Sequence, residues 1–180
     1  MQLNYTQNMI IKILSNAVLL LSVLFHPYVN AEPEVLGWLE SALIKPWGIK
    51  VRAKLDSGAL TSSIHATQIE EYHMDDELWV RFTLTQPINK KNNQSEKKIV
   101  VERPVIRETK IKEHVGDSMI RYVIEMEFCL NGKNYKTPVT LTDRSNFHYP
   151  LLLGRRTLKD NVLIDPGKTF TANKSCLHKK

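Results

Sequence analysis

The sequence predicts an all-β fold, a small closed β-barrel with one short helix near the C-terminus. Several segments alternate apolar and polar residues with the period of two that is typical of half-buried strands. Turn-forming residues separate these segments, and helical periodicity beyond one turn is missing after residue 31. The 180 residues are 42% hydrophobic and 24% charged, which suits one domain with its own core. A β-rich chain of this size closes most simply as a barrel.

The first 31 residues predict a secretory signal peptide. They carry one charged residue, Lys12, and an apolar run over residues 17–25. That run is short for a membrane helix, which takes about 20 apolar residues. We expect cleavage after Ala31, a periplasmic or secreted protein, and no stable membrane span afterwards. Two alternatives stay open, a retained hydrophobic anchor and a start at Met9.

The first predicted strands lead to an acidic turn. Residues 34–47 are expected to form a short strand and a turn, with Trp38 and Trp47 in core or edge packing. Residues 49–55 alternate apolar and basic side chains strictly, and they run directly into Asp56. A half-buried strand is therefore expected to end at this carboxylate.

Further strands are predicted along the middle of the chain, because β-branched and aromatic residues are concentrated there. They cover residues 77–85, 99–112, 119–130 and 135–141. Residues 86–98 are polar and predict a long loop. Asn131-Gly132 is typical of a tight hairpin, so the last of these strands form a β-meander.

The C-terminal part predicts a buried strand, a helical turn and a last strand. The run at residues 149–153 stops at Gly154, residues 157–161 have room for one helical turn, and residues 162–165 form the last strand. The predicted organisation is a signal peptide (1–31), one domain (32–168) and a basic C-terminal tail (169–180).

Charge and cysteine content limit the classes of function. Without Lys12 the 25 Lys and Arg become 24, against 19 Asp and Glu, a net charge of +5. These basic residues are spread along the chain, so we expect no nucleic-acid partner. Cys129 and Cys176 form either a disulfide in an oxidising compartment or two unpaired thiols. Two isolated cysteines do not make a zinc site.

Asp56-Ser57-Gly58-Ala59 is the motif of this sequence that contains a candidate catalytic residue. A carboxylate on a glycine turn can be held at a point that solvent reaches, because Gly58 permits tight backbone geometry. The same residues are also common in ordinary turns. A second element strengthens the case, since an apolar run followed by Gly154-Arg155 lies about 95 residues downstream.

Together these two elements resemble the retropepsin pattern of aspartic peptidases. The string over residues 53–66, Ala-Lys-Leu-Asp-Ser-Gly-Ala-Leu-Thr-Ser-Ser-Ile-His-Ala, is similar to the RimB-like subgroup, bacterial proteins that carry the label ATP-dependent zinc protease. The likeness continues through residues 103–107, 139–144 and 149–158. It spans about residues 35–166, nearly the whole predicted domain.

The resemblance implies a retropepsin-like (acid-protease) barrel and an aspartic endopeptidase that cleaves peptides or proteins as a homodimer. Each subunit would supply Asp56, and Ser57, where the family more often has Thr, would hold the two carboxylates coplanar. Gly58 and Ala59 would also support the dyad, and the other residues that support the motif are Thr61, Ser62, His65, Gly154 and Arg155. Leu60 stands where the subgroup often has Lys or Arg, which puts in doubt any contact made by that charge.

The remaining motif residues favour structural roles. Arg155 is expected to form an ion pair or hold a turn, Asp143 and Arg144 an ion-paired turn, and His65 a hydrogen-bonded packing contact. The family's substrate-covering flap is expected within residues 86–98 or 113–117. We expect no cofactor, because the sequence has neither the H-E-x-x-H of zinc peptidases nor the G-x-x-x-x-G-K-[ST] loop of ATP-binding proteins.

Two other hypotheses compete with that of an exported peptidase. One is a non-catalytic binding or scaffolding module of the bacterial envelope with the same fold. The other is a surface adhesin or coat-like protein, which only the β content and the basic tail favour.

Overall fold

A computed structural model describes residues 32–86, 96–111 and 119–176. The chain divides into two compact units, Met1–Glu32 and Pro33–Lys180. All but one residue of the first unit, and so the predicted signal peptide, lies outside the described residues. Within the described ranges, no helix is long and apolar enough to cross a membrane.

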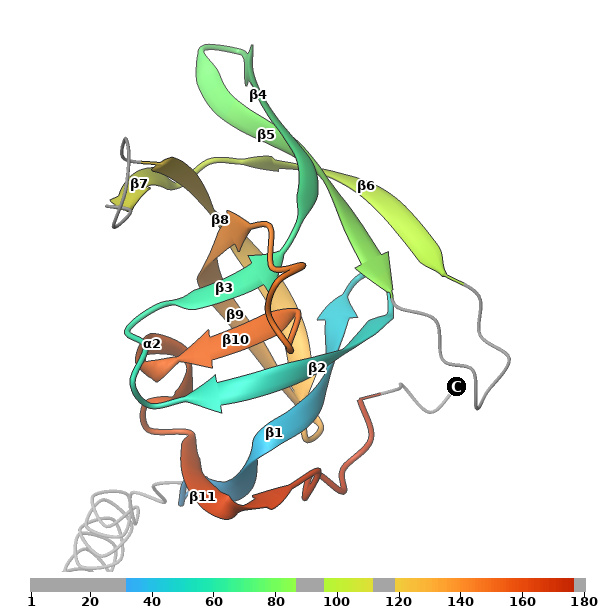
Figure 1. The fold of residues 1–180 in the computed structure, drawn as a ribbon, viewed down its shortest axis with the longest axis vertical. Coiled ribbons are helices and arrows are strands. Elements are labelled where there is room, and N and C mark those ends of the chain that lie inside the picture. The colour runs from blue at the N-terminus through green and yellow to red at the C-terminus, as the bar shows by residue number, and fades with distance from the viewer. Residues whose placement is uncertain (1–31, 87–95, 112–118, 177–180) are drawn as a thin grey trace, which may run out of the picture. The chain divides into compact units, whose positions relative to one another are not determined.

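The second unit consists of strands with one short helix between the last two of them (Figure 1). The elements are β1 (Glu34–Lys45), β2 (Ile49–Asp56), β3 (Ser62–His65), β4 (Thr67–Met74), β5 (Glu77–Gln86), β6 (Lys97–Pro104), β7 (Arg107–Ile111), β8 (Met119–Leu130), β9 (Lys133–Thr142), β10 (Leu151–Gly154), α2 (Arg155–Leu158) and β11 (Val162–Thr169). The all-β prediction and the single short helix near the C-terminus are confirmed.

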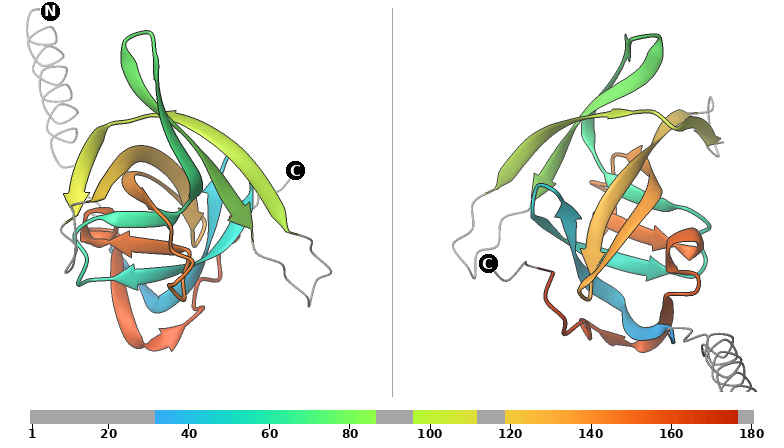
Figure 2. Two further views of the ribbon diagram at one scale, coloured as in Figure 1. Left: turned by 45° about the horizontal axis from the view of Figure 1, so that its top comes forward. Right: turned by 180° about the vertical axis from the view of Figure 1, so that it is seen from behind.

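The larger sheet closes on itself as a barrel, which Figure 2 shows from two sides. Its order is β11-β1-β2-β10-β3-β9-β8-β7, and β1 also pairs with β8, so that β1, β2, β10, β3, β9 and β8 form a ring. The inward side chains of these strands make one buried core, as the period-two pattern predicts. Its largest fully buried members include Phe128, Ile49, Ile124, Leu130, Leu141, Leu151 and Leu153.

Strand β10 is placed by a long crossover. It lies between β2 and β3, parallel to β2 and antiparallel to β3. The register pairs Gly154 with Asp56 and Leu152 with both Lys54 and Ser63. The two motifs found in the sequence are therefore neighbours in one sheet, although about 95 residues separate them.

A second sheet, β4-β5-β6, extends from the barrel (Figure 1). The β4–β5 hairpin turns at Asp75 and Asp76, both with positive φ (51° and 63°), which Asp tolerates better than most residues. Val80 and Phe82 of β5 are fully buried and belong to the same core as the barrel. The hairpin is thus anchored at its base by apolar packing.

Several predicted strand boundaries differ from the structure. The segment 99–112 is not one strand, because β6 ends at Pro104 and β7 begins at Arg107, each in a different sheet. Strands β3 and β4 were not predicted. β3 has only four residues, and β4 is mostly exposed, so neither has a clear apolar alternation. The helix begins two residues earlier than expected, at Arg155.

The predicted basic tail is held against the barrel as far as residue 176. Glu40 is fully buried, and its carboxylate accepts hydrogen bonds from the backbone N–H groups of Gly37, Thr171 and Ala172 and from the Thr171 hydroxyl. Cys129 of β8 and Cys176 form a disulfide, which decides between the two alternatives for the cysteines. Residues 169–176 of the predicted basic tail are thus packed against the barrel.

Candidate active site

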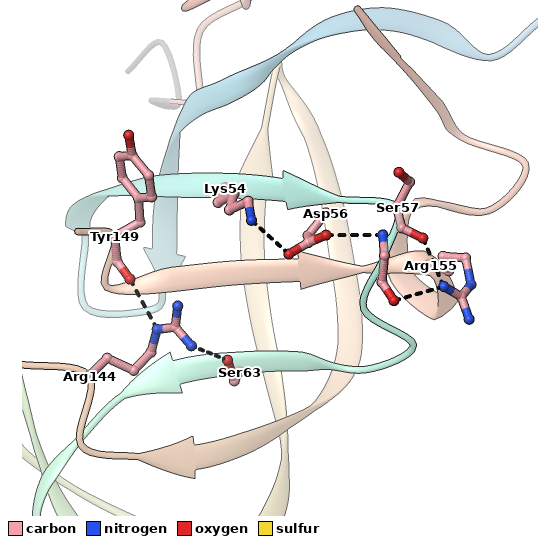
Figure 3. A network of polar contacts seen from close by, with 8 residues as sticks. Lys54, Asp56, Ser57, Ser63, Arg144, Tyr149 and Arg155 are labelled. Carbon is pink, nitrogen blue, oxygen red and sulfur yellow. Dashed lines mark hydrogen bonds and ion pairs between the residues drawn. The ribbon is translucent and has the colours of Figure 1, made fainter. Parts of the chain in front are cut away.

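Asp56 lies at the C-terminal end of β2, with its side chain on the outer face of the barrel (Figure 3). The alternation of β2 buries Ala53 and Leu55 in the core and leaves Lys54 and Asp56 outside. The Asp56 side chain is 21% exposed, so the carboxylate is packed but reachable by solvent.

Three groups hold the Asp56 carboxylate and its turn. The backbone N–H of Gly58 donates to Oδ1 at 3.0 Å, and Lys54 Nζ lies 3.0 Å from Oδ2. The N–H of Ala59 donates to the Asp56 carbonyl at 3.3 Å. Burial by itself raises the pKa of Asp56, but the Lys54 contact and the backbone N–H groups outweigh it and leave the pKa below its ordinary value. A single chain therefore favours an ionised Asp56.

Gly154 permits the two motifs to approach each other. A Cβ atom at this position would lie 2.6 Å from the carbonyl oxygen of Thr61, closer than real Cβ contacts. The Gly154 N–H donates to Ser62 Oγ at 3.1 Å, and Ser62 Oγ lies 2.7 Å from Thr157 Oγ1. Only glycine fits between these backbone segments, and buried hydroxyls fix their spacing.

Arg155 braces the Asp56 loop from the downstream motif. Its Nη1 donates to the carbonyl oxygens of Ser57 at 2.8 Å and Gly58 at 3.0 Å (Figure 3). Its backbone N–H donates to the Ala59 carbonyl at 2.9 Å. The guanidinium thus positions the loop through carbonyl groups, and no described carboxylate forms an ion pair with it.

His65 lies at the other end of β3 from this loop. Its Nδ1 accepts a hydrogen bond from the Arg144 N–H at 2.8 Å, and Asp143 Oδ1 lies 3.5 Å from the same atom. Asp143 also accepts from the Ser145 N–H, and hydrogen bonds from Ser145 together with the nearby His65 leave its pKa below the usual range. His65 has a packing and hydrogen-bonding contact, as expected, and does not touch Asp56.

Arg144 does not form the ion-paired turn that the sequence predicts, and its contacts and burial were not foreseen. Within the described residues it forms no ion pair with Asp143 or any other carboxylate. Its side chain donates from Nε to the Tyr149 carbonyl at 3.0 Å and from Nη1 to Ser63 Oγ at 2.8 Å (Figure 3). It lies 4.5 Å from the ring centroid of Phe147, and Arg144 is only 8% exposed. The Thr-Asp-Arg pattern marked the position but not its burial.

The pKa of Arg144 is lower than usual because of this burial. The positive charge of Arg121 lowers the pKa further, and the negative charge of Asp56 acts in the opposite direction. The Asp56 and Arg144 charges therefore influence each other across the same face of the barrel.

A pocket of about 640 Å³ lies beside Arg144. Its walls come from β1, β2, the end of β5 and the loop before β10. The lining includes Lys50, Arg52, His65, Glu96, Arg144 and Phe147. Arg52 also lies 5.6 Å from the ring of Tyr149, which packs edge-on against Trp38 at 5.8 Å. The pocket is thus bordered by basic and aromatic groups.

The expected flap cannot be assigned to the two predicted segments. Residues 113–117 and most of residues 86–98 lie outside the described residues. The β4–β5 hairpin, with its turn at Asp75 and Asp76, is a third hairpin between the two motifs and projects from the barrel (Figure 1). Sequence reasoning missed it because β4 is mostly exposed.

Within the described ranges, no three His, Cys, Asp or Glu side chains are placed to hold one metal ion. At the Asp56 loop, the described side chains that meet are one carboxylate and one lysine.

The family model described as retropepsin-like aspartic endopeptidase RimB matches residues 35–175. The chain belongs to this RimB-like family. The match covers both motifs, the barrel strands and the C-terminal segment up to residue 175. The retropepsin-like fold and the family expected from the sequence are therefore confirmed.

The chain is also similar to a solved structure and to part of longer curated proteins. The crystal structure of a protein of unknown function from Legionella pneumophila is 31% identical, with a TM-score of 0.62, covering 78% of this chain and 98% of that one. Proteins named probable alpha-L-glutamate ligase, from Shewanella pealeana and Desulfotalea psychrophila, are each 38% identical over 67% and 64% of this chain. The chain spans about a quarter of the length of these curated relatives.

Proposed function

We propose that this RimB-like protein is an exported aspartic endopeptidase whose active site forms between two copies of the chain. The observation that carries the proposal is the Asp56 loop, in which a reachable carboxylate accepts a hydrogen bond from the Gly58 N–H while Arg155 holds the loop through its carbonyl oxygens. Each chain supplies one such loop, so a pair of carboxylates requires a second copy.

The chemistry follows from two carboxylates about 3 Å apart, which share one proton because both cannot be ionised at that distance. The ionised Asp56 accepts a proton from water while the oxygen of that water bonds to the peptide carbonyl carbon. The protonated Asp56 donates its proton to the carbonyl oxygen. When the tetrahedral intermediate collapses and the C–N bond breaks, the Asp56 that took the proton from water gives it to the leaving nitrogen, and the other Asp56 takes a proton from a hydroxyl of the intermediate, which restores the dyad.

An apolar surface beside the Asp56 loop supports the homodimer. Leu60, Val35 and Leu163 are 49%, 60% and 55% exposed. Leu60 and Leu163 line one pocket of about 550 Å³ together with Arg155. Exposed apolar side chains grouped in this way are typical of protein interfaces.

Export to an oxidising compartment is supported by the disulfide between Cys129 and Cys176, since such bonds persist in periplasmic and secreted proteins. It agrees with the signal peptide expected over residues 1–31.

We further propose that the peptides cleaved are rich in glutamate. The relatives named alpha-L-glutamate ligase contain a region similar to this chain. The ligase activity itself belongs to proteins about four times longer and is not assigned here. The basic side chains around the site favour acidic peptides over basic ones.

The competing function is a non-catalytic binding module with the same fold. It is favoured by one observation, the Lys54 contact that leaves a lone Asp56 ionised and unable to act as an acid.

One experiment separates the two. Light scattering gives the oligomeric state, and a peptide library that includes glutamate-rich members gives cleavage by wild type, Asp56→Asn and a control, Asp160→Asn. Asp160 is an exposed loop residue with positive φ, which Asn tolerates. A dimer whose cleavage is lost only in Asp56→Asn supports the peptidase. A folded monomer with no cleavage in any variant would overturn it.

A further inference from the structure

Arg144 is a buried cation that forms no ion pair among the described residues, and Asp56 is the carboxylate whose charge acts on it from a distance. It is only 8% exposed, and its hydrogen-bond partners are the Tyr149 carbonyl and the Ser63 hydroxyl, both neutral. Removing a guanidinium from water without an opposite charge costs free energy that two neutral acceptors only partly offset. An anion that binds beside such a buried guanidinium stabilises it and offsets part of this cost.

The surroundings of Arg144 add further positive charge. Arg121 lies close enough to lower the pKa of Arg144, and its Nε atom is buried without a hydrogen-bond partner in the described part of the chain. Lys50 and Arg52 line the adjoining pocket. Glu96 is the one acidic residue among the described lining residues, and it pairs with Lys98 at 3.4 Å.

The sheet register places Arg144 relative to Asp56. Ser63, which Arg144 contacts, is paired with Leu152, and Leu152 is paired with Lys54 (Figure 3). Two strand spacings separate Ser63 from Lys54, roughly 10 Å at about 4.8 Å each, and Asp56 lies two residues beyond Lys54 on β2, roughly 7 Å at about 3.3 Å each. Ser63 and Asp56 are therefore roughly 12 Å apart, a length that an extended peptide covers in about three to four residues.

We propose that Arg144 is a specificity-determining residue that binds a substrate carboxylate about three to four residues from the cleaved bond. The inference rests on the proposed peptidase function and identifies the side chain that recognises acidic residues in the substrate. The described residues occupy two of the five guanidinium N–H groups, which leaves N–H groups for a carboxylate. The neighbouring Arg121 repels Arg144, and a bound carboxylate relieves that repulsion.

The test measures binding in the whole chain carrying Asp56→Asn, so that no peptide is cleaved. The probes are fluorescent hexaglutamate and hexaglutamine, both acetylated and amidated, so that only side chains supply carboxylates. A hexaglutamine with a free C-terminus tests the other source of a carboxylate. The variants Arg144→Gln, Arg144→Lys and the exposed control Arg107→Gln are compared at one ionic strength.

Arg144→Gln is expected to weaken hexaglutamate binding by about ten- to a hundredfold while changing hexaglutamine binding less than about twofold. Arg144→Lys keeps the charge but not the planar fork, and is expected to recover only part of the loss. Arg107→Gln should leave the ratio between the two peptides unchanged. A purely structural role would weaken both peptides together.

Three results would overturn the inference: equal loss for both peptides in Arg144→Gln, an equal effect of Arg107→Gln, or an Arg144-dependent preference only for the free C-terminus. None of them bears on whether Asp56 cleaves peptides. Conversely, a wild-type chain that cleaves nothing but binds hexaglutamate through Arg144 would overturn the peptidase and keep the carboxylate site. Thermal unfolding of Arg144→Lys confirms that the comparison uses folded protein.

Discussion

Lys54 Nζ lies 3.0 Å from Asp56 Oδ2, two residues apart on the same outer face of β2. A lysine this close keeps a lone carboxylate ionised. An ionised Asp56 can act as the general base of the proposed dyad but not as its general acid. In the proposed dyad, two carboxylates would share one proton near two such lysines. Lys54 therefore influences the ionisation of Asp56 and, in that proposal, the pH range of activity.

Lys54→Met is expected to raise the pKa of Asp56, because burial then acts against fewer stabilising contacts. The pKa of Asp56 is lower in the folded chain than its ordinary value of 3.8, so the ionised group stabilises the fold above that value. This stabilisation is lost as the pH falls through the folded pKa. In Lys54→Met, the folded protein should lose less stability as the pH falls, because the pKa of Asp56 is then closer to its ordinary value.

Carboxyl carbon chemical shifts measured by NMR from pH 2 to 7 test this directly. Lys168→Met, which removes an exposed contact with Asp165, serves as the control and should leave Asp56 unchanged. An unchanged Asp56 titration in Lys54→Met would show that backbone N–H groups alone hold the carboxylate.

Gly154→Ala is expected to destabilise the fold by about 1–3 kcal/mol, because the added methyl group would meet the Thr61 backbone at 2.6 Å. Urea unfolding measures the change. Gly167→Ala is the matched control, since its methyl group would meet only the Asp165 side chain, at 3.3 Å. Equal stability of the two variants would contradict a required close approach.

The Asp56 loop and its neighbour Gly154 could be predicted because each lies in a local motif. A short strand that ends at Asp-Ser-Gly is visible in the sequence, and so is an apolar run before Gly-Arg. Arg144 could be located but not understood, since its burial depends on Ser63, 81 residues away. The β4–β5 hairpin lacked a signal, because the side chains of β4 are mostly exposed on both faces.

Glu40→Gln is expected to lower the free energy of unfolding by about 1–3 kcal/mol, because an amide –NH2 would replace one acceptor facing several N–H and O–H donors. Amide hydrogen exchange at Thr171 and Ala172 should become faster. Glu127→Gln, at a half-exposed residue 4.0 Å from Lys45, should change stability by less than about 0.5 kcal/mol. Similar losses in both variants would contradict the anchoring role of Glu40.

Glu40 also shows where sequence reasoning fails. It occupies one position in an otherwise ordinary strand, and nothing nearby predicts its complete burial. The groups that bury it come from Thr171 and Ala172, more than 130 residues later. The same distance explains why the sequence does not reveal that residues 169–176 pack against the barrel.

Reduction of the disulfide between Cys129 and Cys176 is expected to lower the free energy of unfolding by about 4 kcal/mol, the chain-entropy value for a loop of this length. Urea unfolding with and without a reductant measures it. The double variant Cys129→Ser with Cys176→Ser should match the reduced protein and no longer respond to the reductant. Unchanged stability after reduction would mean that Glu40 and Asn131 hold the C-terminal segment unaided.

The insertion of β10 between β2 and β3 has a consequence for how the protein is made. Asp56 leaves the ribosome early, but its strand partner and the Arg155 brace are synthesised almost 100 residues later. Contacts between such distant segments form late in folding, because the intervening chain must be closed first. In the nascent protein, the Asp56 loop therefore lacks its contacts with Arg155 until nearly all of the domain has emerged.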